Sequence, residues 1–112
     1  MTNVDWQLTE LNNRPVVATP AAVPVTLRLV TAERRVQGNG GCNQYSGSYS
    51  MNGHRLSFGQ IISTKRACVD DALNRQEVAF SEALSQTDRY SLSGNTMTFY
   101  SGDRKLATFT RS

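Results

Sequence analysis

The sequence predicts a small α+β domain: an antiparallel, partly closed β-barrel-like sheet with one helix at about residues 70–85. Short segments of alternating apolar and polar residues follow one another between turns rich in Gly, Asn and Pro, which is typical of sequential antiparallel strands. From Asp70 the period changes, and Leu73, Phe80 and Leu84 fall on one stripe at helical spacing. Many short strands with one late helix favour a twisted sheet that closes toward a barrel, with the helix across an open side or end.

The strands can be placed by their period-two alternation. They are expected around residues 4–8, 25–29, 36–38, 45–51, 54–58, 90–92, 97–99 and 106–109. Asn52-Gly53 separates the fourth and fifth segments, and Asn-Gly is the strongest short signal for a two-residue hairpin of type I′. Gly40-Gly41-Cys42-Asn43 predicts a sharply bent backbone, because Gly and Asn tolerate positive φ.

Length and composition indicate one ordered domain over residues 1–112. A chain of 112 residues is long enough for one hydrophobic core. Hydrophobic residues make up 38% and charged residues 19%, which is ordinary for a soluble fold. The longest apolar run, Val16-Val17-Ala18, is far shorter than the ~20 residues of a membrane helix, so no membrane-spanning segment is expected.

The charge pattern does not favour a nucleic-acid partner. Twelve Lys and Arg residues against nine Asp and Glu residues give a formal charge of +3, but the basic residues are spread along the whole chain. Binding to a phosphate backbone normally requires a concentrated basic patch. A single-strand binder on a small barrel stays an alternative that would need Tyr and Arg side chains on one exposed face.

The two cysteines and the one histidine do not form a recognisable reactive set. Cys42 would act as a nucleophile only with a base that lowers its pKa, and His54 follows an Asn-Gly turn that places it at an exposed hairpin edge. Cys42, His54 and Cys68 lack the short paired spacing and the fourth ligand of a zinc site. We therefore expect no catalytic residues, no metal and no cofactor.

Glu77 is the unexpected residue of the predicted helix. It lies between Leu73 and Phe80 on the stripe that should face the core, and a buried carboxylate costs several kcal/mol unless it is paired or hydrogen-bonded. Its candidate partners are Thr64, Arg66 and the backbone N–H groups of the Gly40-Gly41 bend. We predict a buried structural carboxylate rather than a catalytic acid, because the sequence offers no second catalytic group beside it.

Tyr45 and Tyr49 lie on one face of their predicted strand. We expect both rings to pack inward, with their hydroxyl groups hydrogen-bonded at the sheet edge. The alternative is a ligand site. If the barrel were only partly filled, Trp6, Tyr45, Tyr49 and Phe58 would line a small apolar pocket at its mouth.

Several groups of residues are specific when their order and spacing are taken together. They are Trp6-x-Leu8, Gly38 with Gly41-Cys42-Asn43-x-Tyr45-x-Gly47-x-Tyr49, Thr64 with Cys68, Glu77-x-x-Phe80-x-x-x-Leu84, and Tyr90, Ser93-Gly94-Asn95, Met97 and Phe99 near the end. In this order they resemble the META domain, also called the HslJ-like family, over essentially the whole chain. The sequence departs from the family at Asn12-Asn13, where a glycine often precedes the proline, and at Lys65-Arg66, where arginine followed by methionine is more usual.

The resemblance implies a domain of the bacterial cell envelope with no established catalytic reaction. The full-length protein would be periplasmic or a lipoprotein anchored to the outer membrane, with its leader absent from this chain; a cytoplasmic location stays open. Family members are linked to stress responses and drug tolerance. The family positions also imply that Cys42 and Cys68 form a disulfide or a close thiol pair, and a bridge between them would lower the entropy of the unfolded chain by about 3.5 kcal/mol.

We therefore expect a non-enzymatic, monomeric envelope domain that acts through contacts with a protein or an envelope surface. A small-ligand carrier with a barrel-mouth pocket is one alternative, and a continuous apolar cavity would distinguish it. A peptidase inhibitor is another, and it would need an exposed loop that inserts into a protease, either residues 14–24 or residues 38–43.

Overall fold

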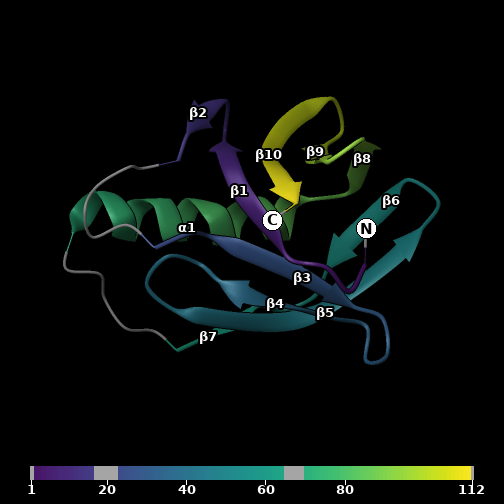
Figure 1. Cartoon of the computed structure of the whole chain (residues 1–112), viewed down its shortest axis with the longest axis horizontal. Coiled ribbons are helices and arrows are strands. Elements are labelled where there is room, and N and C mark those ends of the chain that lie inside the picture. The colour runs from purple at the N-terminus through teal and green to yellow at the C-terminus, as the bar shows by residue number, and fades with distance from the viewer. Residues whose placement is uncertain (1, 17–22, 65–69, 112) are drawn as a thin grey trace.

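The computed structural model describes residues 2–16, 23–64 and 70–111. Ten strands form one antiparallel sheet, and eight of them close into a barrel in the order β1-β3-β4-β5-β6-β8-β9-β10, with β10 returning to β1 (Figure 1). The barrel strands are β1 (Trp6–Leu11), β3 (Thr26–Val30), β4 (Arg35–Asn39), β5 (Gln44–Asn52), β6 (Arg55–Phe58), β8 (Arg89–Ser93), β9 (Thr96–Ser101) and β10 (Arg104–Arg111). Two short strands, β2 (Arg14–Pro15) and β7 (Ile62–Ser63), pair with β1 and β5. The predicted fold class is confirmed.

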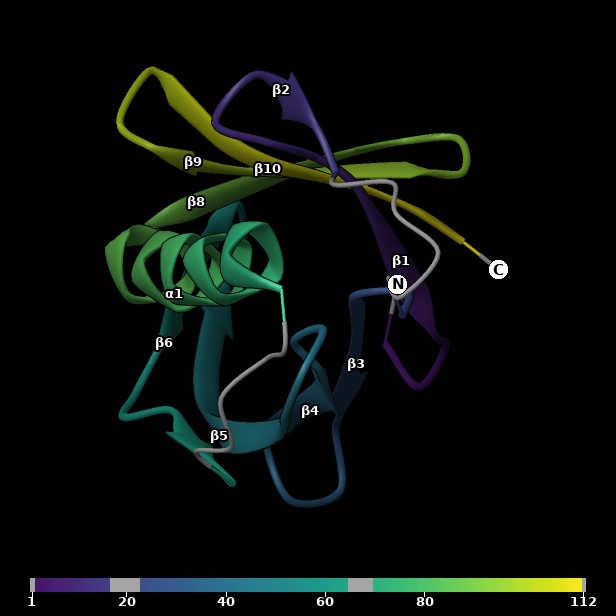
Figure 2. The same ribbon diagram turned by 90° about the vertical axis from the view of Figure 1, so that its left-hand side faces the viewer.

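The barrel is closed, but two of its neighbouring strands are paired over a very short length. Strand β1 pairs along its full length with the second part of β10, from Trp6 opposite Arg111 to Leu11 opposite Ala107. Strands β6 and β8 pair at one position, where Arg55 lies opposite Arg89. Helix α1 (Asp71–Gln86) packs against β6 and β10, and Figure 2 shows it between β8–β10 and β5–β6. The helix therefore covers the side of the barrel where the sheet is least continuous.

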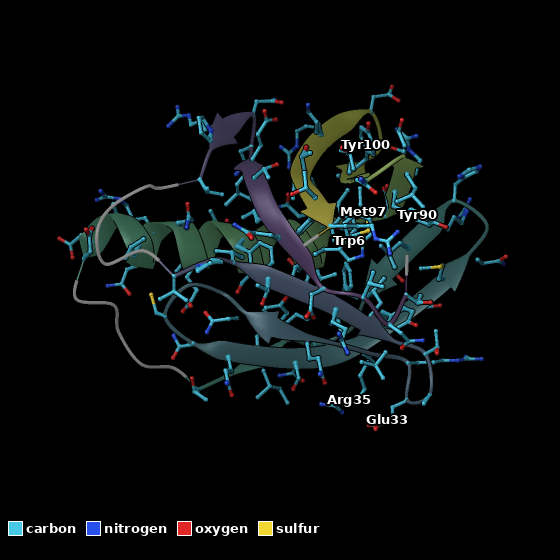
Figure 3. The ribbon with its side chains drawn as sticks, viewed as in Figure 1. Trp6, Glu33, Arg35, Tyr90, Met97 and Tyr100 are labelled. Carbon is cyan, nitrogen blue, oxygen red and sulfur yellow. The ribbon has the colours of Figure 1, made fainter. Side chains whose placement is uncertain are left out.

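Large side chains fill the barrel interior. Trp6, Leu27, Met97, Phe99 and Phe109 are fully buried. The Phe99 and Phe109 ring centroids lie 4.9 Å apart, and Phe80 of α1 adds its ring 6.2 Å from that of Phe109. In Figure 3, Trp6 and Met97 lie inside the barrel, whereas Glu33 and Arg35 lie at its outer edge. Alternation along each strand thus puts apolar residues into one shared core.

The helix forms where the change of period predicts it. Asp70 is the N-cap, and its carboxylate accepts a hydrogen bond of 2.8 Å from the Ala72 N–H, which satisfies one of the free donors of the first turn. Leu73, Phe80 and Leu84 are buried, as their spacing indicates. The helix ends at Gln86, where the Thr87 hydroxyl donates a hydrogen bond of 2.7 Å to the Ala83 carbonyl.

Four hairpins of the sheet have two-residue loops. Asn12 and Asn13 join β1 to β2 with φ of 53° and 65°, and positive φ at both positions is the type I′ turn, so asparagine makes this turn without glycine. Gly53-His54, Gly94-Asn95 and Gly102-Asp103 each place a glycine of positive φ first, which is the type II′ arrangement.

The hairpin predicted at Asn52-Gly53 forms, but its loop lies one residue later than expected. Asn52 pairs with Arg55, and Gly53-His54 is the loop. Both registers keep inward-facing residues opposite one another, so alternation does not choose between them. The observed register sets Tyr49 opposite Phe58 and Met51 opposite Leu56, which gives two apolar cross-strand pairs.

Candidate functional site

The Glu77 carboxylate is held by the loop between β4 and β5. Its Oε2 atom accepts hydrogen bonds of 2.8 Å from the Cys42 N–H and of 2.8 Å from the Asn43 N–H. Its Oε1 atom accepts a short hydrogen bond from the Asn43 side-chain amide. The helix and the glycine-rich loop, more than thirty residues apart in the chain, are thus joined by three hydrogen bonds to one carboxylate.

Two features of Glu77 differ from the expectation. The donors are the N–H groups of Cys42 and Asn43, which follow the Gly40-Gly41 bend, because the bend turns these two amides toward the helix. The residue is also half-buried rather than fully buried, since its carboxylate reaches the loop near the barrel surface. The three hydrogen bonds offset the free-energy cost of taking the carboxylate partly out of water.

Asn43 and Thr64 extend this cluster. Asn43 is 3% exposed, and its side-chain oxygen accepts a hydrogen bond of 2.8 Å from the Thr64 hydroxyl. Thr64 therefore supports Glu77 through Asn43, not by a direct hydrogen bond. Arg66, the other side-chain partner considered for Glu77, lies outside the described residues, as does Cys68. The pairing of Cys42 with Cys68 accordingly stays a prediction.

The glycines of the loop are needed for this contact. A Cβ atom at Gly40 would lie 3.1 Å from Glu77 Oε2 and 3.3 Å from Glu77 Cγ, which is closer than side chains normally pack. Gly41 has φ of 113°, a conformation that residues with a side chain rarely adopt. Both glycines let the loop backbone approach the helix closely enough for its N–H groups to reach the carboxylate.

Cys42 and His54 are not brought together. Cys42 precedes β5 and His54 lies in the loop that follows it, so the nine-residue strand separates them, a span on the order of 25 Å. The His54 ring instead lies near Tyr90, with ring centroids 6.4 Å apart. Within residues 2–16, 23–64 and 70–111, no three His, Cys, Asp or Glu side chains gather in a way that could hold a metal ion.

Core packing takes the place of the apolar pocket considered from the sequence. Trp6, Tyr45 and Tyr49 belong to the hydrophobic core and are at most 8% exposed. Phe58 is half-buried, and its ring centroid lies 5.5 Å from that of Phe99. The helix supplies Phe80 to the same space, 5.6 Å from the Tyr45 ring. These side chains fill the barrel, because α1 adds apolar volume that strand alternation does not reveal.

The Tyr45 hydroxyl closes a gap between β3 and β4. It donates a hydrogen bond of 2.7 Å to the Thr26 carbonyl, beside a hydrogen bond of 3.0 Å from the Asn39 N–H to the Thr26 hydroxyl. Gly38 leaves room for both groups, since a Cβ atom there would lie 2.1 Å from the Thr26 carbonyl oxygen. Burial raises the pKa of the Tyr45 hydroxyl well above its ordinary value.

The outer face of the barrel beside this gap carries a broad polar groove of about 910 Å³, here called the sheet groove. Arg28, Gln37, Ser46 and Ile62 follow one another in register across β3, β4, β5 and β7 and form its centre. Its ends are formed by Asp5, Arg35, Asn39, Gln44 and Thr64. Period-two alternation indicates that these residues face outward, but the pairing of four strands was needed to show that they share one groove.

The charges of the sheet groove are unequal. Arg28 forms an ion pair with Asp5, with 2.9 Å between Nε and Oδ1. Arg35 lies 3.9 Å from Glu33, a separation too long for a hydrogen bond, and both side chains are largely exposed. The groove therefore offers amide and hydroxyl groups together with one arginine that is weakly paired.

These features define a small α+β barrel domain in which an acidic helix residue anchors a glycine-rich loop. The chain belongs to the META domain family, whose profile matches residues 1–112, so the resemblance seen in the sequence is confirmed. No curated protein matches the sequence. No helix in the described part of the chain combines the length and apolarity needed to cross a membrane.

Two solved structures share this fold. An NMR structure of a protein from Burkholderia xenovorans is 30% identical, with a TM-score of 0.78 over 99% of this chain and 83% of that one. A second protein solved by NMR is 20% identical, with a TM-score of 0.75 over 98% of this chain and 90% of its own, and it shows likeness of fold alone.

Proposed function

We propose that this META domain is a non-enzymatic binding module of the bacterial cell envelope that acts through the sheet groove. The observation that carries the proposal is the row Arg28, Gln37, Ser46 and Ile62, which presents outward-facing polar and apolar groups across four paired strands. A rigid sheet presents such groups in a fixed geometry, which lowers the entropic cost of binding. The envelope location and a role in stress or drug tolerance rest on family membership and stay predictions.

The chemistry of the groove favours a protein segment rich in acidic and amide side chains. Arg35 is available for a charge-assisted hydrogen bond because its contact with Glu33 is long and exposed. Gln37, Ser46 and Gln44 offer both donors and acceptors. Glu77, by contrast, already accepts three hydrogen bonds from the loop, which supports an architectural role for the carboxylate.

A peptidase-inhibitor function has less support. An inhibitor loop has to enter a protease active site, and in the loop of residues 38–43 the Asn43 side chain is buried and tied to the helix. The second candidate loop, residues 14–24, lies partly outside the described residues. The groove is therefore the better candidate for partner recognition.

The proposal is tested by affinity capture from bacterial envelope extract with chemical cross-linking and mass spectrometry. The bait is the full chain, compared with Arg35→Glu in the groove and with Arg55→Glu on β6 as a charge-matched control. We expect the same partner to be captured by the parent chain and by Arg55→Glu, and to be lost with Arg35→Glu. Equal capture by all three chains would contradict the proposal.

A further inference from the structure

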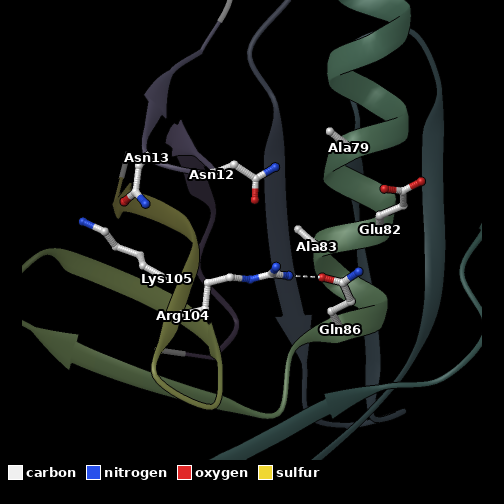
Figure 4. Close-up of a pocket in the computed structure, with 8 residues that line it drawn as sticks. All are labelled: Asn12, Asn13, Ala79, Glu82, Ala83, Gln86, Arg104 and Lys105. Atoms are coloured by element: carbon white, nitrogen blue, oxygen red, sulfur yellow. Dashed lines mark hydrogen bonds between the residues drawn. The ribbon is translucent and has the colours of Figure 1, made fainter.

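A second hollow lies between α1, the turn that follows β1 and the start of β10. Its volume is about 390 Å³, within the range of small-ligand sites, and we call it the helix pocket (Figure 4). Ala79 and Ala83 form its floor, and their small side chains leave the space that larger helix residues would fill. It shares no residue with the sheet groove.

One wall of the helix pocket carries hydrogen-bond donors. The Arg104 guanidinium donates one hydrogen bond of 2.6 Å, to the Gln86 side-chain oxygen, and forms no ion pair among the described residues. Asn12 and Asn13 add two side-chain amides from the type I′ turn, and a hydrogen bond of 2.8 Å from the Asn12 N–H to the Leu106 carbonyl fixes that turn against β10. This wall suits a carboxylate.

The helix side of the pocket carries the opposite charge. Glu82 lines the pocket, and its carboxylate has no ion-pair partner among the described residues. It lies one turn before Gln86, which binds Arg104, so about 6 Å along the helix axis separates the acidic position from the basic one. An ammonium group beside Glu82 and a carboxylate beside Arg104 would each meet an opposite charge.

An apolar hollow of about 330 Å³ adjoins the helix pocket and shares Ala79 and Glu82 with it. Val78, which is 59% exposed, forms its apolar wall. A ligand that placed its two charges between Glu82 and Arg104 could therefore bury an aliphatic side chain against Val78 and Ala79. Such burial favours binding because it removes apolar surface from water.

We propose that the helix pocket binds a small zwitterion with an apolar side chain, either a free aliphatic amino acid or a short aliphatic peptide. The α-carboxylate accepts from Arg104 and the asparagine amides, the ammonium group donates to Glu82, and the side chain lies over Ala79 toward Val78. The site is separate from the proposed partner surface. It is also separate from the barrel interior, which the core fills.

The test is an NMR titration of the full chain with leucine and with leucyl-leucine, following the amides of Ala79, Ala83 and Gln86. N-acetylleucine lacks the cation and leucinamide lacks the carboxylate. We expect saturable shifts with leucine or leucyl-leucine and at least about tenfold weaker binding of both blocked analogues. The zwitterion with the higher affinity shows whether the pocket is suited to a free amino acid or to a peptide.

Variants locate the site. Arg104→Gln and Glu82→Gln should each weaken leucine or leucyl-leucine binding about tenfold or more, and Ala79→Leu should abolish it by filling the floor. Arg55→Gln and Glu33→Gln are exposed controls that should keep the parent affinity. Absence of saturable shifts with both zwitterions, equal binding of the blocked analogues, or unchanged affinity in both charge variants would each overturn the proposal. Arg35→Glu, which tests the sheet groove, should leave this binding unchanged.

Discussion

A single carboxylate joins the helix to the sheet. Glu77 accepts hydrogen bonds from two backbone amides and one side-chain amide of the β4–β5 loop. The two backbone amides depend on Gly40, where a Cβ atom would crowd the Glu77 side chain, and on Gly41, whose positive φ a residue with a side chain rarely adopts. The loop and the acid therefore form one unit, and each residue type in it has a physical reason.

Replacing this acid should destabilise the fold. Glu77→Gln keeps one acceptor oxygen and replaces the other with an NH2 donor, so either the two backbone N–H groups or the Asn43 side-chain amide loses its acceptor, at a cost of about 2 kcal/mol. Urea unfolding measures the change. Glu82→Gln, on the same helix, should stay within about 0.5 kcal/mol of the parent chain. A parent-like stability of Glu77→Gln would refute the clamp.

The buried Tyr45 hydroxyl should make the stability of the fold depend on pH in the alkaline range. Its folded-state pKa is raised above the ordinary value of 10.0, so above about pH 10 the unfolded state loses the proton while the folded state keeps it. The free energy of unfolding should therefore fall as the pH rises above 10. Tyr45→Phe removes this proton but leaves the Thr26 carbonyl without its partner, at a cost of about 1 kcal/mol near neutral pH.

The difference in unfolding free energy between the parent chain and Tyr45→Phe should consequently narrow between pH 8 and pH 11. Urea unfolding across this range measures it. Tyr100→Phe, at a position partly exposed on β9, is the control and should keep the alkaline decline of the parent chain. A constant difference between the parent chain and Tyr45→Phe would show that burial does not hold the Tyr45 proton.

At the scale of the elements, two glycines of the sheet serve different purposes. Gly94 begins a type II′ loop with φ of 59° and has open space where a Cβ atom would lie, so Gly94→Ala costs backbone strain alone, about 1 kcal/mol. Gly38 faces the Thr26 carbonyl, and Gly38→Ala would force β3 and β4 apart. We expect Gly38→Ala to lose at least twice as much unfolding free energy. Equal losses would contradict the close packing at Gly38.

The helix is an element that the sequence alone predicts. Leu73, Phe80 and Leu84 predict the helix because a 3.6-residue period is local, and Asp70 marks its start. The same stripe identifies Glu77 as a charge that needs partners. The hydrogen-bond partners of Glu77 come from the β4–β5 loop. The sequence indicated the Gly40-Gly41 bend as a source of donors, but it did not show that the N–H groups of Cys42 and Asn43 are the ones that donate.

Other contacts depend on pairing between distant segments. Alternation shows that Trp6, Tyr45 and Tyr49 face inward, but it does not show that Phe80 occupies the space between them. The sheet groove and the helix pocket likewise combine residues from elements that are far apart in the chain. Sequence patterns give the direction of a side chain, whereas cavities depend on how whole elements pack.

At the scale of the whole molecule, a bridge between Cys42 and Cys68 would connect the β4–β5 loop to the segment before the helix. The simple loop model gives about 3.5 kcal/mol for such a closure. We expect the oxidised chain to gain no alkylation mass before reduction and to gain two alkyl groups after it. Two alkylated thiols in chain purified under oxidising conditions would reject the bridge.

Glu77 and the glycine-rich loop tie the helix to the barrel through three hydrogen bonds. Amide hydrogen exchange at Cys42 and Asn43 tests this role, compared between the parent chain and Glu77→Ala, which removes the acceptor oxygens. We expect these two amides to exchange in the parent chain as slowly as those of the buried turns of α1, and their protection to fall selectively in Glu77→Ala. Fast exchange of both amides in the parent chain, or equal protection in the two chains, would show that the carboxylate does not hold the loop.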